Sequence, residues 1–493
     1  MKTAFTIFLF IFFHHCYVLS QSYLLKSKIK DSGRASKTHT LLQYDSSGYY
    51  ILRYSKNINY AELEHYNQQL KHQKTYIVTD KSRKYIGVVS LGQKMYMLYF
   101  YYVLNKQQNT HDKVSLYAEE ILPETYALSG DSIELIEPFR MVSNYYTGNF
   151  AISPDQSKFL VYDYEEDGDV EGLRGLTNKI RLRVFDRSFN QLWTRTVNLS
   201  PNGGAKRQVA IKKLRINNRG EVAILTDIFR KTRSYNLKNI TADPTLFFVG
   251  KEKNNYALFQ PQMGDYFFNQ ISFTFDSNGD IIWFGFYSKE RYYQQKGVFF
   301  IKINSDRTKV LVKKMHELSP ELLAQLLHRN KVRPDTEARS YKLKHWNLMA
   351  DGGIVLSAEQ QPSSSFNFKC NDILSLRFDA SGDIMWAKHF FKHGNQPKNQ
   401  KVFLSHFLCN KNNQTYLIYN RGIYSDGYAN VTRIDSAGRV TNKKIFNYLN
   451  QQELVCPPLS YHLPGTQLFL CLQDRYFSNY RFALLDLEKL FSK

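Results

Sequence analysis

Short stretches of alternating apolar and polar residues, each closed by a turn of polar or glycine residues, run along most of the chain. Alternation with a period of two is typical of β-strands that bury one face. One series of equivalent turns contains Gly48, Gly92, Asp155, Gly220, Gly279, Gly352, Asn412 and Gly465. Their mean spacing of about 60 residues lies near the roughly 40–50 residues of compact sheet repeats, so the pattern indicates a repeated unit.

Each unit shows the same internal order of four predicted strands. One unit has Ile271–Phe275, Ile281–Tyr287, Gly297–Ile303 and Lys309–Met315, and the next has Trp346–Met349, Gly353–Ala358, Ile373–Phe378 and Ile384–Phe390. The tight turns Asp276–Gly279, Asp379–Gly382 and Asp435–Gly438 separate neighbouring strands. Asp can cap such a turn with its own side chain, and Gly adopts the positive φ that the reversal requires. The pattern therefore predicts antiparallel four-stranded sheets.

The two ends of the chain predict how the repeats close. Eight units can be counted, but the last has only the predicted strands Gln467–Gln473 and Tyr480–Leu487 before the sequence ends. The N-terminal strand Tyr23–Ile29 has no partner in its own unit. If it completes the last sheet, no strand edge is left open. We therefore predict an all-β fold, a β-propeller of eight four-stranded blades closed by an N-terminal strand in the last blade. Seven blades is the alternative, because the first two units are the least regular.

One clear helix is predicted, at Pro320–His328. Ser319 can cap its N-terminus, Pro stands at the first helical position and Glu321 follows. The helix falls in the widest gap of the turn series. We interpret residues around 319–345 as a helical insertion within a single propeller domain that spans 21–493, with Leu484–Lys493 as the last strand and a short tail.

Residues 1–20 have the features of a secretory signal peptide. Lys2 precedes a short apolar run, Ala4–Phe13, and Val18 and Ser20 stand at positions −3 and −1 of the expected cleavage site. No later stretch approaches 18 consecutive apolar residues, and the longest, Tyr96–Leu104, is predicted to be a strand. We expect an exported chain without a transmembrane segment after signal removal, periplasmic or associated with the outer membrane.

Four cysteines, Cys370, Cys409, Cys456 and Cys471, follow the signal peptide. Cys456 and Cys471 flank the turn Leu463–Gly465 almost symmetrically, so they could form a disulfide across a hairpin. Four small buried thiols are the alternative interpretation. The spacings match no zinc site, and we expect neither a metal nor a cofactor.

Composition changes this picture only in part. Of 493 residues, 43% are hydrophobic and 22% are charged, which excludes wholesale disorder. Aromatic residues make up 15%, which agrees with β-structure. The formal net charge is +22, and such an excess of positive charge favours acidic partners but does not indicate a fold.

The repeated Asp-x-x-Gly turns, followed by aliphatic residues and by Trp283 or Trp386, resemble those of the exported β-propeller proteins of Bacteroidota. The abundance of Lys, Asn, Tyr and Phe and the signal peptide ending Leu19-Ser20-Gln21 agree with this resemblance. It covers most of the mature chain but contains no active-site motif. Such proteins include subunits of outer-membrane assemblies, among them the type IX secretion translocon, and proteins that act on glycans, so the resemblance implies a fold rather than one role.

No catalytic constellation is predicted. The loop carboxylates form no pair that could act on a glycosidic bond. The acidic segment 163–171 resembles a calcium loop, but Arg174 stands where a bidentate acid is required, and a solvated acidic loop is the better interpretation. His389 and His393 share one strand face without a third metal ligand, as ordinary strand-end histidines do.

Positive charge gathers in the loops that join successive blades, or the second and third strands of a blade. This predicted basic rim contains Arg34, Lys37, Lys81, Arg83, Lys84, Lys206, Arg207, Arg230, Lys231, Arg233, Lys238, Lys331, Arg333, Arg339, Lys342, Lys344, Lys392, Lys398 and Lys401. A face of one sign focuses electrostatic potential and speeds the capture of an acidic partner. The alternative is that these residues only keep an exported protein soluble.

We predict a non-catalytic, exported β-propeller that acts as a protein-interaction or scaffold subunit at the periplasmic side of the outer membrane. An acidic protein surface or outer-membrane complex is the expected partner, with acidic glycans or lipopolysaccharide next. Nucleic acid is not expected, because the export signal removes most such roles. The alternative is a carbohydrate-active propeller, a lyase or hydrolase, or a binding module for acidic glycans, in which a Tyr or His near the axis abstracts a proton.

Overall fold

The computed structural model describes two compact units, each assembled from separate stretches of the chain. The middle unit spans 79–320 and 333–338, and the terminal unit spans 1–78, 321–332 and 339–493. The described residues are 24–26, 28, 30–31, 38–55, 60–79, 83–92, 94–105, 110–122, 125, 127–140, 149–165, 179–199, 208–229, 242–252, 256–261, 264, 266–289, 294–333, 335–362, 367–392, 395–397, 403–422, 427–447, 453–463, 465, 467–474 and 479–492. The predicted signal peptide, 1–20, lies outside them.

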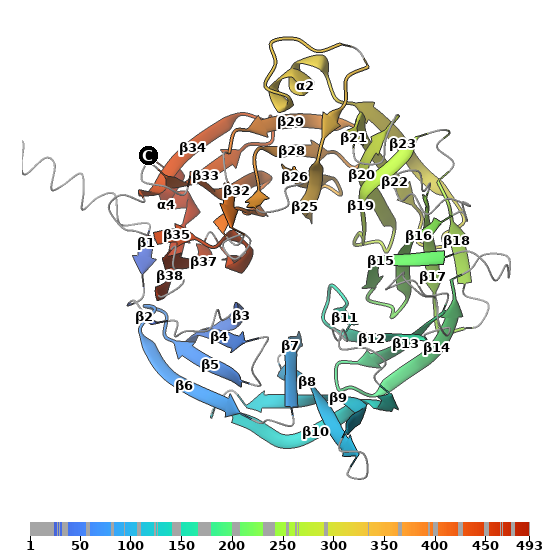
Figure 1. The fold of residues 1–493 in the computed structure, drawn as a ribbon, viewed down its shortest axis with the longest axis vertical. Coiled ribbons are helices and arrows are strands. Elements are labelled where there is room, and N and C mark those ends of the chain that lie inside the picture. The colour runs from blue at the N-terminus through green and yellow to red at the C-terminus, as the bar shows by residue number, and fades with distance from the viewer. Residues whose placement is uncertain are drawn as a thin grey trace, which may run out of the picture. The chain divides into compact units, whose positions relative to one another are not determined.

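The middle unit consists of four antiparallel sheets of four strands each (Figure 1). The strands are β7 (Arg83–Leu91), β8 (Lys94–Asn105), β9 (Thr110–Leu122) and β10 (Ala127–Arg140); β11 (Asn149–Ile152), β12 (Lys158–Glu165), β13 (Lys179–Asp186) and β14 (Gln191–Asn198); β15 (Gln208–Ile216), β16 (Val222–Phe229), β17 (Ala242–Val249) and β18 (Tyr256–Phe259); β19 (Phe267–Phe275), β20 (Ile281–Ser288), β22 (Gly297–Ile303) and β23 (Val310–Glu317), with β21 (Gln294–Gln295) beside β20. The strand predicted at Tyr96–Leu104 lies within β8 and is confirmed.

The terminal unit contains the other four sheets. Their strands are β3 (Thr38–Asp45), β4 (Gly48–Ser55), β5 (Tyr60–Tyr66) and β6 (His72–Thr79); β25 (Tyr341–Leu348), β26 (Ile354–Gln360), β28 (Ile373–Phe378) and β29 (Ile384–Phe390); β31 (His406–Lys411), β32 (Gln414–Arg421), β33 (Tyr428–Ile434) and β34 (Val440–Asn447); β35 (Glu453–Val455), β37 (Gln467–Asp474), β38 (Asn479–Asp486) and β1 (Leu24–Lys26). The short strands β2 (Lys30–Asp31), β27 (Asn367–Lys369), β30 (Asn395–Pro397) and β36 (Tyr461–His462) also belong to the terminal unit, and the boundary between the units along the chain falls within β24 (Ala338–Arg339). Eight four-stranded blades define an all-β protein of the β-propeller class, as predicted.

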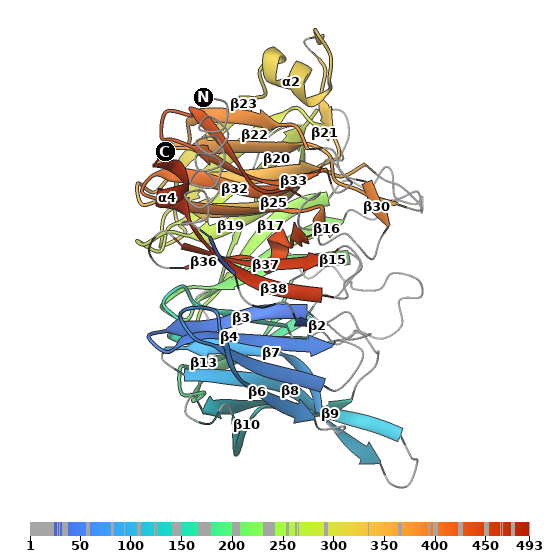
Figure 2. The same cartoon turned by 90° about the vertical axis from the view of Figure 1, so that its left-hand side faces the viewer.

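The chain termini meet in the last blade of the terminal unit. Strand β1 pairs antiparallel with β38, with Leu24 opposite Leu485 and Lys26 opposite Ala483. Figure 2 shows the same blade from the side, with β38 next to β37. The predicted closure by the N-terminal strand is therefore confirmed for its described residues. This pairing satisfies the edge of β38, which would otherwise offer open hydrogen-bonding groups.

The Asp-x-x-Gly turns form as the sequence predicts. Asp435 accepts hydrogen bonds through Oδ1 from the backbone N–H groups of Ala437, at 3.0 Å, and Arg439, at 2.9 Å. Gly438 has φ +80°, and a Cβ there would lie 2.8 Å from the Cβ of Trp386. Glycine is thus required both by the backbone conformation and by the close approach of the neighbouring blade.

The helices differ in part from the prediction. Helix α2 (Pro320–Leu326) is confirmed but ends two residues early, and it buries Leu323 and Leu326. The tail prediction is wrong, because β38 ends at Asp486 and helix α4 (Leu487–Phe491) follows. Asp486 starts α4 by accepting a hydrogen bond from the backbone N–H of Lys489, at 3.1 Å. A 3₁₀ turn, η4 (Pro457–Leu459), also lies in the last blade.

A buried polar contact joins the first and last blades of the terminal unit. The guanidinium of Arg53 on β4 donates to the hydroxyl of Tyr480 on β38 at 2.6 Å, and that hydroxyl donates to Glu64 at 3.0 Å. Tyr66 also donates to Glu64, at 3.0 Å. Because all four side chains are buried, each hydrogen bond replaces one that water would otherwise make. The contact therefore stabilises the joint between the β3–β6 blade and the last blade, in which the two terminal strands pair.

Candidate functional site

Most of the predicted basic rim lies outside the described residues. Those members are Arg34, Lys37, Lys81, Lys206, Arg207, Arg230, Lys231, Arg233, Lys238, Lys398 and Lys401. The described members are Arg83, Lys84, Lys331, Arg333, Arg339, Lys342, Lys344 and Lys392. Their surroundings range from fully exposed to fully buried. The rim as a whole therefore stays a prediction, and its described members divide into distinct groups.

Arg83 is held by its own blade. Its guanidinium lies 2.5 Å from Glu119 Oε2 and 4.5 Å from the ring centroid of Tyr99. Glu119 also accepts a hydrogen bond from the Tyr99 hydroxyl, at 3.2 Å. The charge of Arg83 is thus compensated inside the middle unit, and Lys84 beside it is half-buried. Arg333, in contrast, is exposed in this unit.

Lys342 lies near one edge of the β25–β29 sheet in the terminal unit, and Arg339, on β24, stands three residues before it in the chain. Strands β25 and β28 begin at this edge, and β26 and β29 end there. The side chains of Arg339 and Lys342 are exposed, and so is that of Phe391, at 48%. On the adjacent blade, the guanidinium of Arg421 lies 5.6 Å from the ring centroid of Phe391. The ring of His328 lies 5.7 Å from that of Phe391. We call these five residues, His328, Arg339, Lys342, Phe391 and Arg421, the α2 rim.

Lys392 does not belong to an exposed rim, and this part of the prediction is wrong. Its side chain is 1% exposed, and its ammonium lies 2.5 Å from Oε1 of Glu359, which is fully buried. Lys344 is half-buried, and burial lowers the pKa of its ammonium. Sequence assigns both residues to exposed basic loops, but Lys344 lies within β25 and Lys392 follows the end of β29. The ion pair with Glu359 stabilises the buried ammonium of Lys392, since a buried ammonium is stable mainly next to a carboxylate.

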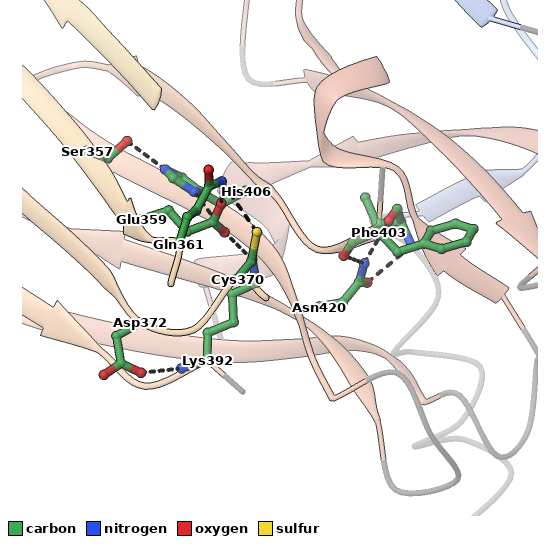
Figure 3. A network of polar contacts seen from close by, with 10 residues as sticks. Ser357, Glu359, Gln361, Cys370, Asp372, Lys392, Phe403, His406 and Asn420 are labelled. Carbon is green, nitrogen blue, oxygen red and sulfur yellow. Dashed lines mark hydrogen bonds and ion pairs between the residues drawn. The ribbon is translucent and has the colours of Figure 1, made fainter. Parts of the chain in front are cut away.

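Glu359 is the centre of a buried polar cluster, shown in Figure 3. The Gln361 amide donates to Oε2 of Glu359 at 3.0 Å and lies 3.4 Å from the thiol of Cys370. Nδ1 of His406 lies 3.9 Å from Oε1 of Glu359, and Nε2 of His406 lies 2.7 Å from the hydroxyl of Ser357. Ser357, Glu359 and His406 are all fully buried. We call these residues, with Lys392, the Glu359 cluster.

Electrostatics fixes the charge of each member of this cluster. Burial alone would raise the pKa of Glu359, but Lys392 and His406 outweigh burial and lower it. Burial lowers the pKa of His406, and burial together with His406 lowers the pKa of His345 to about 3. Burial and Glu359 raise the pKa of the Cys370 thiol to about 12. At neutral pH Glu359 is therefore a carboxylate, His406 and the neighbouring His345 are neutral, and the Cys370 thiol is un-ionised.

In space, His406 lies between Ser357 and Glu359, as the base lies between the nucleophile and the orienting acid in a catalytic triad. Ser357 is fully buried, however, so a substrate carbonyl cannot approach its hydroxyl in this structure. The separation of 3.9 Å between His406 and Glu359 also exceeds hydrogen-bond distance. The arrangement therefore acts chemically as a packed polar core rather than as an exposed reactive centre.

Asp372 connects His328, which stands two residues after helix α2, to His389 of strand β29. Its buried carboxylate lies 2.7 Å from Nε2 of His328 and 2.9 Å from Nε2 of His389. The backbone N–H of Lys392 lies 3.4 Å from its other oxygen. His389 thus has a structural contact that sequence analysis missed, because its partners stand far apart in the chain. His393, its predicted neighbour, lies outside the described residues.

Asn420 joins two neighbouring blades beside the Glu359 cluster. Its amide donates to the backbone oxygens of Phe403, at 2.9 Å, and Val455, at 2.7 Å. Its side-chain oxygen accepts from the backbone N–H of Val455 at 3.2 Å. Sequence analysis missed both this residue and the cluster. One pattern could have indicated the cluster, since Ser357, Glu359 and Gln361 take alternate positions at the end of an otherwise apolar strand.

Cys456 and Cys471 lie opposite each other in the last blade, with the backbone N–H of Cys456 donating to the carbonyl of Cys471 at 2.8 Å. Both thiols are free and buried, as are those of Cys370 and Cys409. Burial and the neighbouring Cys471 raise the pKa of Cys456. A disulfide between them stays a prediction, which the intact mass of the exported protein with and without reductant tests.

The part of the chain that the structure describes contains no group of three or more His, Cys, Asp or Glu side chains placed to hold a metal ion. In the predicted acidic loop, Asp163 belongs to β12 and pairs with Arg183 at 2.5 Å. The rest of segment 166–171 lies outside the described residues. Within the described ranges, no helix is both long enough and apolar enough to cross a bilayer.

The geometry places the chain in the β-propeller class, and comparison with known proteins gives no narrower family. No family model and no curated protein matches the chain. Solved structures that it resembles include a prolyl endopeptidase, at 10% identity and a TM-score of 0.41, with 93% of this chain and 55% of that chain covered. The chain thus spans about half the length of that enzyme.

Two further similar structures differ in role. The WD40 domain of SCAP from fission yeast is 8% identical, with a TM-score of 0.42 and coverage of 94% of this chain and 99% of that one. An ulvan lyase of polysaccharide lyase family PL25 is 10% identical, with a TM-score of 0.38 and coverage of 81% and 91%. A peptidase, a lyase and a WD40 domain share no activity, so these likenesses concern the fold alone.

Proposed function

We propose that this protein is a non-catalytic interaction or scaffold subunit that binds an acidic protein surface through the α2 rim. One observation carries the proposal: exposed Arg339, Lys342 and Arg421 share an edge of the terminal unit with the exposed ring of Phe391. Interface centres typically combine an aromatic side chain with arginine. Exposed cations around such an anchor attract a negatively charged partner and raise its association rate.

The rim has a rigid support, which favours specific binding. Beneath it, Asp372 holds His328 of the α2 segment, and the Glu359 cluster fills the end of the same sheet. Side chains that are already ordered lose less conformational entropy when a partner binds. Asp372 therefore helps to fix the position of His328, whose ring lies 5.7 Å from that of Phe391.

The compartment is part of the proposal and rests on sequence. The features of a signal peptide in residues 1–20 favour export, and the resemblance to exported Bacteroidota propellers favours the periplasmic side of the outer membrane. The subunit would then serve an outer-membrane or secretion assembly, of which the type IX translocon is one example. Acidic surfaces reachable there include proteins, lipopolysaccharide and acidic glycans.

The second candidate is a binding module for acidic glycans, because the same cations would hold uronate or sulfate groups. Its catalytic version, a lyase or hydrolase, needs a reactive group that a substrate can reach. The buried state of Ser357, Glu359 and His406 argues against a catalytic role for that cluster.

Copurification with crosslinking at native expression levels tests the proposal. Wild-type protein should recover a stoichiometric partner from detergent-solubilised membranes, and the double variant Arg339→Ser/Lys342→Ser should lose it. Lys309→Ser, which removes an exposed lysine of the middle unit, is the matched control and should retain the partner. Recovery of wild type only as a free monomer, or equal recovery by the rim variant, would contradict the proposal. Partner loss on glycosidase treatment would favour the glycan-binding candidate.

A further inference from the structure

A small cavity of about 260 Å³ lies at the far end of the β31–β34 blade from Arg421. Its lining consists of Lys411, Asn412, Gln414, Tyr416, Arg433, Leu487, Glu488, Phe491 and Ser492. The lining comes from the end of β31, the β31–β32 turn, the start of β32, from β33 and from helix α4 with the residue after it, all within the terminal unit. Pockets for drug-sized ligands measure roughly 300–1,000 Å³, so this cavity suits a ligand of about one sugar ring.

Strand register explains why the polar side chains converge. Lys411 stands opposite Gln414, and Tyr416 stands opposite both Cys409 and Arg433. Because residues two apart on a strand share a face, Lys411, Gln414, Tyr416 and Arg433 all project from the same face of the sheet. Helix α4 lies over this face, with Phe491 5.9 Å from Tyr416 between ring centroids.

The cavity contains two cations whose charge is not compensated by a carboxylate. Among the described residues neither Lys411 nor Arg433 forms an ion pair, and Arg433 instead lies over the ring of Phe491 at 4.7 Å. Lys411 also lowers the pKa of nearby His462, after burial, which shows that its charge reaches beyond its own side chain. The single carboxylate of the lining, Glu488, leaves a net positive cavity.

The other polar side chains of the lining can form hydrogen bonds with neutral groups of a ligand. The Tyr416 hydroxyl donates to the oxygen of Gln414 at 2.6 Å, which leaves the Gln414 amide hydrogens to donate elsewhere. Asn412, Glu488 and Ser492 are exposed at the mouth of the cavity. The lining thus combines anion-binding cations, amide and hydroxyl groups, and an aromatic ring.

We propose that this cavity binds one acidic sugar unit, with Lys411 and Arg433 on the carboxylate. Hydroxyl groups of the ring would bond to Gln414, Asn412 and Glu488, while its C–H face packs near Phe491. A sugar acid satisfies all of these groups together, whereas a simple anion uses only the two cations and leaves the amides to water. The site is separate from the α2 rim and does not depend on the function proposed for that surface.

Titration of the mature chain with glucuronate, glucose and acetate, followed by ligand-observed NMR at low salt, tests the site. Glucuronate should bind at least about tenfold more tightly than glucose, since hydrogen bonds between charged partners are roughly twice as strong as neutral ones. It should also bind at least about tenfold more tightly than acetate. Equal binding of glucose, or equal binding of acetate, would overturn the assignment, the latter in favour of a plain anion site.

Variants assign the binding to this cavity. Arg433→Gln and Lys411→Gln should each weaken glucuronate binding about tenfold. Lys411→Gln is the decisive variant, because Arg433 also packs on Phe491 and its loss can loosen α4. Arg439→Gln removes an exposed arginine of the β33–β34 turn and should leave binding unchanged. The α2 rim variant Arg339→Ser/Lys342→Ser should also bind glucuronate normally. Unchanged affinity in Lys411→Gln would overturn the proposal.

Discussion

Lys392 and Lys342 belong to the same blade and to similar stretches of sequence, yet their surroundings are opposite. Lys392 is almost fully buried and pairs with Glu359, whereas Lys342 is exposed at the α2 rim. The buried ammonium is costly to remove from water and stable only because its partner is in place. The exposed one is free to meet a partner molecule at little cost to the fold. A basic residue that sequence assigns to a loop therefore indicates a binding surface only once the burial of its side chain and its ion pairs are known.

The largest expected effect comes from breaking the buried pair. Glu359→Gln leaves the charge of Lys392 in the core and should lower the free energy of unfolding by about 3–5 kcal/mol. Urea denaturation followed by tryptophan fluorescence measures it. Glu120→Gln is the matched control, since Glu120 pairs with the exposed Lys94 and should change stability by less than about 1 kcal/mol. Similar losses in both variants would remove the contrast between buried and exposed pairs.

Tyr480→Phe should have the next largest effect. The change leaves Arg53 and Glu64 without the hydroxyl that lies between them, and should cost about 1–3 kcal/mol of unfolding free energy. Tyr101→Phe, at an exposed position of the middle unit, should be close to neutral. An unchanged free energy of unfolding in Tyr480→Phe would show that this contact contributes little to joining the first and last blades.

Acidification should weaken the terminal unit through His345, a half-buried histidine next to His406. The pKa of His345 in the folded protein is about 3, below the value of roughly 6.5 in an unfolded chain. The unfolded state therefore binds more protons between these values, and stability falls as pH falls from about 6.5 towards 3. The slope from this group should be at most about 1.4 kcal/mol per pH unit. His345→Gln should flatten the dependence of the unfolding free energy on pH, and an unchanged slope would contradict the assignment.

The smallest effect on stability is expected at the α2 rim. Lys342→Ser removes an exposed side chain and should change the unfolding free energy by less than about 0.5 kcal/mol. Thermal unfolding checks this value. A large loss would show that Lys342 supports the fold, as Lys392 does, and would weaken its role in binding.

Sequence analysis predicted the elements whose pattern is local. Turns such as Asp435–Gly438 contain both the capping carboxylate and the glycine that they need. The N-terminal strand near Leu24 has no partner in the first sequence unit, which predicted its pairing in the last blade. Helix α4 was missed because only five residues form it, too few to show a helical period. The stability of such a short helix depends on its N-cap residue, here Asp486, more than on the spacing of its apolar residues.

The functional residues were harder to predict because their contacts are not local. His328 and Asp372 meet although they are 44 positions apart, and Ser357 meets His406 across neighbouring blades. Sequence identified Arg339 and Lys342 as basic loop residues but could not separate them from Lys392. The burial of the side chain distinguishes Lys392 from Arg339 and Lys342, and it depends on how whole sheets pack against each other.

The most direct test of the central claim compares partner recovery by two folded variants. In crosslinked pull-downs from native membranes, Arg339→Ser/Lys342→Ser should keep wild-type stability but recover less than about a tenth of the partner, since several charge-assisted contacts would be lost. Lys309→Ser should recover as much as wild type. Undiminished recovery by a stably folded rim variant would contradict the claim that this edge of the terminal unit binds the partner.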